Sequence, residues 1–254
     1  MTNPLADPYF ILNKVYGGGA FLKQAIAETP IEEQNRARTV KIVYGVMENV
    51  IYLEHCIRAF APKSPKLPVR IVLKISVYML LFLGKKKYMV SDNAVSLVKK
   101  LGKGGAAGFV NAFLRAFDAD KIELPAGELA ALSVRTSCPQ FALSRLIKAY
   151  GKETAEKVAA FRAEGVSVRF CCDEEKLEAY LSGAEYQKTP FADTYIFRNF
   201  ARDEGYDEGE YTFQSVGSVA IAAGVEPCEN VLDACAAPGG KSVLLSEKCA
   251  KVTS

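Results

Sequence analysis

Near its carboxyl end the chain carries a short glycine-bearing turn whose residue types and spacing could bind a nucleotide-like ligand. The stretch VLDACAAPGGKS (231–242) passes from an apolar run through Asp233 and small residues to PGGK (238–241), and amphipathic sequence follows. A turn of this kind, between a buried strand and a helix, places backbone N–H groups at the positive end of the helix. The sequence therefore predicts binding of the polar or anionic part of a ligand at this turn.

Two common phosphate-binding patterns do not fit the turn. A Walker A loop requires a glycine five residues before its Gly-Lys-Ser, and Cys235 occupies that position. The dinucleotide fingerprint G-x-G-x-x-G is also missing, because the turn contains only Gly239 and Gly240. ATP hydrolysis and NAD binding are therefore disfavoured, and a strand–helix turn that binds no ligand is the simpler alternative.

The composition argues against several other kinds of chemistry. His55 is the only histidine, which removes most catalytic and metal sites that depend on imidazole. The seven cysteines are irregularly spaced and include no Cys-x-x-Cys pair. This pattern is typical of reduced thiols and not of a disulfide framework or a zinc site. We therefore expect no bound metal.

Charge is distributed unevenly along the chain. Residues 1–140 carry 19 lysines and arginines against 11 acidic residues, whereas residues 141–254 carry 13 against 18. The basic half predicts an anionic partner, and a randomly uneven surface is the alternative. The most apolar run, 71–84, contains Lys74 and is too short to cross a bilayer, and the first residues do not resemble a secretion signal. We expect a cytoplasmic monomer that does not bind membranes.

The first part of the chain has the periodicity of helices. Apolar residues recur at helical intervals through 31–60, Pro68 can open a buried helix over 71–84, and SDN (91–93) is typical of a helix start. Residues 4–134 are therefore predicted to form a helical bundle.

After Pro139 the pattern changes. Two further helices are predicted over 140–151 and 152–165, followed by short strands and one helix through 166–200. The acidic segment 201–211 is interpreted as a turn or linker. A helix, a buried strand and a returning helix, which together open an α/β domain, are predicted at 213–224, 229–235 and 239–249.

The motif D-x-C-A-A-P-G-G-K-[ST] at 233–242 resembles the cofactor loop of the RNA cytosine-5 methyltransferases of the RsmB (Sun/Fmu) and NSUN group. In that family the loop cradles S-adenosylmethionine. The resemblance implies that Asp233 closes the strand and that the side chain of Cys235 packs beneath the turn. The implied cofactor-lining residues are Cys235, Ala236, Ala237, Pro238, Gly239, Gly240 and Lys241.

The resemblance extends over most of the chain and implies a multidomain α and α/β fold. Segments 70–83, 91–115 and 138–151 are similar to the NusB-type RNA-binding domain of the bacterial RsmB branch. The implied parts are a NusB-like helical RNA-binding domain (1–136), a small α+β RNA-binding subdomain with leading helices (137–211), and the first βα unit of a Rossmann-like methyltransferase domain (212–254).

The family's chemistry implies catalytic residues that this sequence does not contain. A cysteine thiolate attacks C6 of cytosine, C5 then accepts the methyl group, and loss of the C5 proton precedes release of the enzyme. The two cysteines involved stand in Pro-Cys and Thr-Cys contexts beyond the cofactor loop, and neither context occurs between Lys241 and Ser254. We therefore assign no catalytic residue, and expect this chain to be the front portion of an enzyme and inactive alone.

Clustered basic residues of the helical part predict contacts to RNA phosphates. Such contacts do not read sequence and weaken steeply with salt. A solvated helix face is the alternative. Arg169 resembles a family residue on an RNA-facing strand. The clustered residues are Lys85, Lys86, Lys87, Lys99, Lys100, Lys103 and Arg115.

Two functions of different classes follow from these residues. The first is an S-adenosylmethionine-dependent cytosine-C5 methyltransferase of RNA, with small-subunit 16S rRNA as the expected substrate. The alternative is a NusB-like RNA-binding or antitermination-type factor whose methyltransferase remnant has no function. The loop favours the first, because a dedicated binding factor has no reason to retain it.

Overall fold

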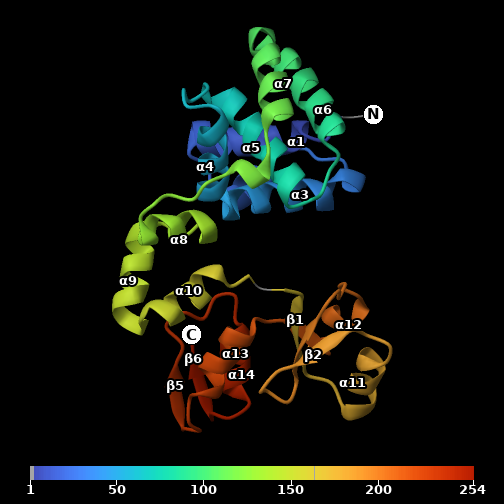
Figure 1. The fold of residues 1–254 in the computed structure, drawn as a ribbon. Coiled ribbons are helices and arrows are strands. Elements are labelled where there is room, and N and C mark those ends of the chain that lie inside the picture. The colour runs from blue at the N-terminus through green and yellow to red at the C-terminus, as the bar shows by residue number, and fades with distance from the viewer. Residues whose placement is uncertain (1–2, 163) are drawn as a thin grey trace. The chain divides into compact units, whose positions relative to one another are not determined.

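The computed structural model describes residues 3–162 and 164–254, which fall into two compact units, one within 1–161 and the other within 162–254. The first unit is all-helical, as predicted (Figure 1). Its α-helices are α1 (Ala6–Gly18), α2 (Leu22–Ala27), α3 (Glu33–Glu48), α4 (Val50–Phe60), α5 (Leu67–Leu81), α6 (Lys87–Lys100), α7 (Ala107–Ala116), α8 (Glu128–Thr136), α9 (Gln140–Tyr150) and α10 (Lys152–Ala160), with 3-10 turns at Gly104–Ala106 and Ala119–Lys121.

Helix α5 is the centre of the first unit. It is buried on all sides from Val69 to Met79 except at Arg70, and it contacts α1, α3, α4, α6 and α7. Gly45 on α3 allows this close packing, because a Cβ at that position would lie 2.0 Å from the Tyr78 ring. Among the described residues, no helix has the length and apolar character needed to cross a membrane.

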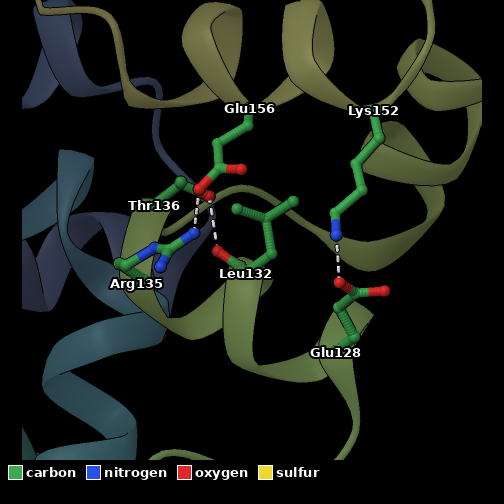
Figure 2. A network of polar contacts seen from close by, with 6 residues as sticks. All are labelled: Glu128, Leu132, Arg135, Thr136, Lys152 and Glu156. Atoms are coloured by element: carbon green, nitrogen blue, oxygen red, sulfur yellow. Dashed lines mark hydrogen bonds and ion pairs between the residues drawn. The ribbon is translucent and has the colours of Figure 1, made fainter.

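Helices α8, α9 and α10 form a smaller cluster within the first unit. Leu132, Leu143 and Ala159 are its buried apolar residues. Figure 2 shows two ion pairs that join α8 to α10, Arg135 with Glu156 and Lys152 with Glu128. These pairs are exposed, so each contributes little to stability by itself.

The second unit begins with a four-stranded antiparallel sheet in the order β2-β3-β1-β4. Its strands are β1 (Val166–Phe170), β2 (Tyr186–Lys188), β3 (Thr194–Phe197) and β4 (Tyr211–Phe213), with helices α11 (Glu174–Leu181) and α12 (Glu204–Asp207). The core of this part is aromatic, because Phe170, Phe197 and Tyr211 pack with Tyr180 and Phe200. The short strands predicted in 166–200 are confirmed.

The segment 201–211, interpreted as a turn or linker, consists mostly of turns but also contains the one-turn helix α12 and the first residue of β4. Asp203 caps α12 by accepting a hydrogen bond from the backbone N–H of Gly205 at 3.1 Å, and Tyr211 begins the edge strand β4. The Tyr211 hydroxyl donates to Asp203 Oδ1 at 2.9 Å, which fixes this segment to the sheet. The acidic and glycine residues that are typical of a loop are here a helix cap and short turns around a buried tyrosine.

The last part of the chain forms the predicted helix–strand–helix sequence and reaches a second strand. Its elements are α13 (Val216–Ala223), β5 (Asn230–Leu232), α14 (Gly240–Ser246) and β6 (Lys251–Thr253). Strands β5 and β6 are parallel, with Val231 opposite Val252, and α14 connects them. The glycine-bearing turn therefore lies at the carboxyl end of β5, directly before α14.

Candidate functional site

One buried carboxylate holds both ends of the glycine-bearing turn. Asp233 follows β5, is 9% exposed, and its backbone N–H donates to Thr253 O at 2.8 Å. Its Oδ1 accepts a hydrogen bond from the backbone N–H of Cys235 at 3.1 Å, and its Oδ2 accepts one from Ser242 Oγ at 2.7 Å. Both carboxylate oxygens therefore accept hydrogen bonds within the protein, and Asp233 links the residues at the two ends of the turn.

The turn itself presents backbone and small side chains. Gly239 has a φ of +111°, a conformation that favours glycine, and its backbone N–H donates to Ala236 O at 2.5 Å. A Cβ at Gly239 would meet no atom within 4 Å, and Cys235, Ala237 and Pro238 are exposed. The side chain of Cys235 therefore does not pack beneath the turn as expected. The turn leaves room for a ligand to approach its backbone.

A chain of buried polar groups connects the turn to the four-stranded sheet. Gln214, 6% exposed, donates from Nε2 to Gly240 O at 3.1 Å and accepts at Oε1 from Arg169 Nε at 3.0 Å. Arg169 Nη1 donates to Glu247 Oε1 at 2.9 Å, at the end of α14. Buried polar groups that are fully hydrogen-bonded specify one arrangement of the elements they join.

The sequence analysis did not identify Gln214, Ser242 or Glu247 as partners of the turn. The signal for Gln214 was present, because it is a polar residue at the junction between a strand and an apolar helix. Arg169 was predicted to face RNA. It is 4% exposed and has Nε and Nη1 engaged, so an RNA contact by Arg169 stays a prediction that its burial does not favour.

The predicted RNA-contacting residues form two groups at opposite ends of the α6–α7 hairpin. Lys99, Lys100 and Lys103 are exposed at the carboxyl end of α6. Lys85, Lys86, Lys87 and Arg115 are at the other end, about 20 Å away along a 14-residue helix. Figure 1 shows α6 and α7 side by side.

Lys87 has a structural partner within this hairpin. Its Nζ donates to Phe117 O at 2.6 Å and to Arg115 O at 3.3 Å, so it satisfies backbone carbonyls at the end of α7. The Lys87 ammonium is therefore less available to a phosphate than the ammonium groups of Lys85 and Lys86, which are exposed.

Several cysteines are poorly suited to act as nucleophiles. Burial raises the pKa of Cys56 to about 11 and raises the pKa of Cys171 and Cys172. The pKa of Cys228 is raised first by its hydrogen bond to Cys249, whose Sγ is 3.4 Å away. Because the thiolate is the nucleophilic form, these upward shifts disfavour covalent chemistry at all four of these thiols.

Comparisons with known proteins indicate the family to which the chain is similar. Residues 11–119 match the NusB family. The chain is 30% identical to the probable ribosomal RNA small subunit methyltransferase B of Bacillus subtilis (strain 168), over 92% of this chain and 56% of that protein. The chain is RsmB-like, with a NusB-like amino-terminal domain. A second protein with the same description, from Synechocystis sp., is 24% identical over 89% of the chain and 55% of its own length.

A solved structure supports the fold of the RsmB-like chain. The crystal structure of PH0851 matches with a TM-score of 0.65 and 19% identity, over 98% of this chain and 62% of that one. At this identity the match shows the fold alone, which is multidomain with α and α/β parts. The RsmB-like chain spans about half the length of the curated relatives it matches.

Proposed function

We propose that the chain is the RNA-binding and cofactor-binding portion of an enzyme that methylates C5 of cytosine in the 16S RNA of the small ribosomal subunit, with S-adenosylmethionine as methyl donor. The observation that carries this proposal is the turn at 233–242, where Asp233 fixes both ends and Gly239 exposes the backbone. The relatives described as ribosomal RNA small subunit methyltransferases support the substrate class.

The turn suits a polar, nucleoside-like ligand because it presents backbone groups and leaves room for a ligand beside them. Residues 235–241 contribute backbone groups and small side chains, and nothing lies within 4 Å of a Cβ built at Gly239. When bound there, S-adenosylmethionine supplies a methyl group activated by a sulfonium. The chain's own part is to hold this ligand at 235–241 while Asp233 keeps the turn rigid.

The remaining parts are assigned by the same proposal. Residues 1–136 are the NusB-like RNA-binding domain, 137–211 the small RNA-binding subdomain, and 212–254 the opening of a Rossmann-like domain, for which the parallel pair β5–β6 is the support. The two basic groups of the α6–α7 hairpin contact RNA phosphates. We assign no catalytic residue to the chain, place it in the cytoplasm as a monomer, and expect no methyl transfer from it alone.

Calorimetric titration of the chain with S-adenosylmethionine and S-adenosylhomocysteine tests the cofactor site. We expect Gly239→Val to abolish binding, because a branched side chain is strained at a φ of +111° and blocks approach to the backbone. Gly224→Ala is the control, because Gly224 ends α13 with a φ of −72° and a Cβ there makes ordinary contacts.

The two functions give different results in a parallel RNA-binding titration. Binding of both RNA and S-adenosylmethionine supports the methyltransferase. Binding of RNA without either cofactor ligand would overturn the cofactor proposal and support the NusB-like RNA-binding factor.

A further inference from the structure

A cavity of about 580 Å³ lies inside the first unit, between α8 and the helices α1, α4 and α5. It is separate from the basic ends of the α6–α7 hairpin and contains none of the residues to which a function was assigned above. Its polar lining residues include Tyr16, Glu54, His55, Arg58, Arg70 and Lys74.

The charges in this cavity are not balanced. The Lys74 side chain is 7% exposed, and its Nζ lies 3.0 Å from Glu54 Oε2. Arg70 Nη1 lies 3.6 Å from Glu54 Oε1, so one carboxylate serves two cations. Arg58 adds a third positive charge to the lining. Burial lowers the pKa of Lys74, the nearby charges of Arg70 and Arg58 lower it further, and Glu54 raises it.

Two hydrogen-bond donors in the cavity are also unpartnered. Within the described residues, Arg70 Nε and the Tyr16 hydroxyl are buried and have no hydrogen-bond partner. Burial and the nearby charge of Glu54 raise the pKa of Tyr16 to about 12, so the hydroxyl keeps its proton. A buried donor left unsatisfied destabilises the fold. Both residues line the cavity, so an acceptor bound there that reached these two atoms would remove this cost.

The donors are held in place before any ligand binds. Lys74 Nζ lies 4.4 Å from the centre of the Tyr16 ring, a cation–π contact that fixes the ring. Arg70 Nη1 donates to Ser64 Oγ at 3.3 Å, which leaves Nε to face another acceptor. Side chains positioned in advance lose less conformational freedom on binding.

We propose that this cavity is a binding site for a phosphate group. A phosphate carries one or two negative charges and several acceptor oxygens, which fit three cations against one carboxylate and two unpartnered donors. The group can come from a free nucleotide or from the backbone of an RNA strand. Only the RNA source rests on the proposed function; the phosphate chemistry does not.

Calorimetric titrations of the full chain at constant ionic strength in chloride test the site. The three probes are inorganic phosphate, cytidine monophosphate and a short single-stranded RNA without a terminal phosphate. We expect Tyr16→Phe to weaken phosphate binding about 5-fold and Arg58→Gln about 10-fold, because each removes one donor to an anion. Tyr16→Phe removes an unpartnered hydroxyl, so folding is preserved.

Matched controls lie outside the cavity on the same unit. Tyr88→Phe and Arg145→Gln change exposed residues that do not line it, and we expect no effect on phosphate binding. Binding of phosphate or cytidine monophosphate that both cavity variants weaken supports a nucleotide site. Binding of the RNA alone, weakened in the same way, supports a backbone site.

Two results would overturn the inference. One is the absence of binding for all three probes at concentrations up to about 10 mM. The other is binding that the cavity variants and the controls change equally. Because the S-adenosylmethionine titration uses the other unit, a chain that binds phosphate but not the cofactor would reject the proposed function and leave this site standing.

Discussion

Two regions of the chain, helix α5 in the first unit and the turn at 233–242 in the second, hold their structure by different means. In the first, α5 is surrounded by apolar side chains, and residues such as Leu73 and Ile75 are fully buried. In the second, the turn at 233–242 is held by hydrogen bonds that the Asp233 carboxylate accepts and that Gln214 donates, while the neighbouring apolar residues Ile221 and Leu232 are 67% and 71% exposed.

This difference shows that the contacts that stabilise the fold are not the same as those that fix the conformation of the turn. Apolar burial is non-directional and gives the first unit most of its free energy of unfolding. Hydrogen bonds of buried polar groups contribute less in net terms but fix directions, which a ligand-binding turn requires. Substitutions in the first unit should therefore cost stability, whereas substitutions around the turn should cost local order and ligand binding.

The largest effect is expected for Leu73→Ala. Leu73 is fully buried on α5, and removal of such a side chain costs about 2–5 kcal/mol. Hydrogen exchange of each unit, followed in urea, measures the loss unit by unit. The control is Leu232→Ala, which removes a 71% exposed side chain and should change stability by less than about 0.5 kcal/mol. Equal costs for the two leucines would contradict the comparison.

The next largest effect on stability is expected at the ion pair of Lys74 and Glu54 in the first unit. Glu54→Gln leaves Lys74 buried without its carboxylate, and we expect a loss of about 2–3 kcal/mol, less than for a fully buried pair because Glu54 is 20% exposed. Lys74→Met is the matched variant, in which an apolar side chain replaces the cation, and it should remain near the stability of the parent chain.

The pH dependence of this loss has a definite sign. The pKa of Lys74 is lowered in the folded chain by burial, and loss of Glu54 lowers it further. The folded state therefore binds the proton less tightly than the unfolded state, so stability is reduced at low pH and regained as pH rises through the folded pKa. Urea unfolding of Glu54→Gln should approach the parent toward pH 10, about the ordinary pKa of lysine. A deficit that grows with pH would rule out this cause.

In the second unit, Asp233→Ala should act mainly on the turn. The methyl side chain offers no acceptor, so the bonds from Cys235 N–H and from Ser242 Oγ are both lost, at about 1–3 kcal/mol. Hydrogen exchange at 234–241 should rise and S-adenosylmethionine binding should weaken. Ser242→Ala removes one of the two bonds and should have a smaller effect in the same direction. Unchanged exchange in both variants would show that the carboxylate does not fix the turn.

Most of the helices were predictable because their signals are local, but the helix start predicted at SDN (91–93) was wrong, because α6 begins at Lys87 and these residues lie inside it. Apolar periodicity in 31–60 and the buried run 71–84 determine which faces pack, and both became core helices. The turns of 201–211 were predictable from its acidic and glycine residues, whereas the attachment of this segment to the sheet depends on Tyr211, which pairs with Phe170 on β1. Periodicity within one segment does not report such a partner.

Only the part of the candidate site that is contiguous in the sequence could be predicted. The motif at 233–242 placed the turn and its small residues, and the opening strand and helix lie where they were predicted, but β5 is largely exposed and not buried as expected. The partners Gln214 and Arg169 come from the sheet that precedes α13, and sequence distance hides their contacts. For Arg169, the resemblance predicted a place on an RNA-facing strand, whereas its burial and its ion pair with Glu247 are known only from the structure.

The smallest effects on stability are expected for substitutions at the two ends of the α6–α7 hairpin. The same substitutions test whether the basic residues there bind RNA. The triple variant Lys99→Gln, Lys100→Gln, Lys103→Gln and its counterpart Lys85→Gln, Lys86→Gln, Arg115→Gln remove exposed charges only, so neither should cost more than about 0.5 kcal/mol per site. RNA affinity measured against salt separates the ends, since each lost phosphate contact on a single strand reduces the slope by about 0.7. A slope lowered by one triple and not by the other assigns RNA to that end, and equal reductions assign it to both. Lys87→Gln should instead loosen the end of α7, because Lys87 holds the carbonyl of Phe117. If neither triple changes the slope, the basic residues form a solvated helix face and RNA is bound elsewhere.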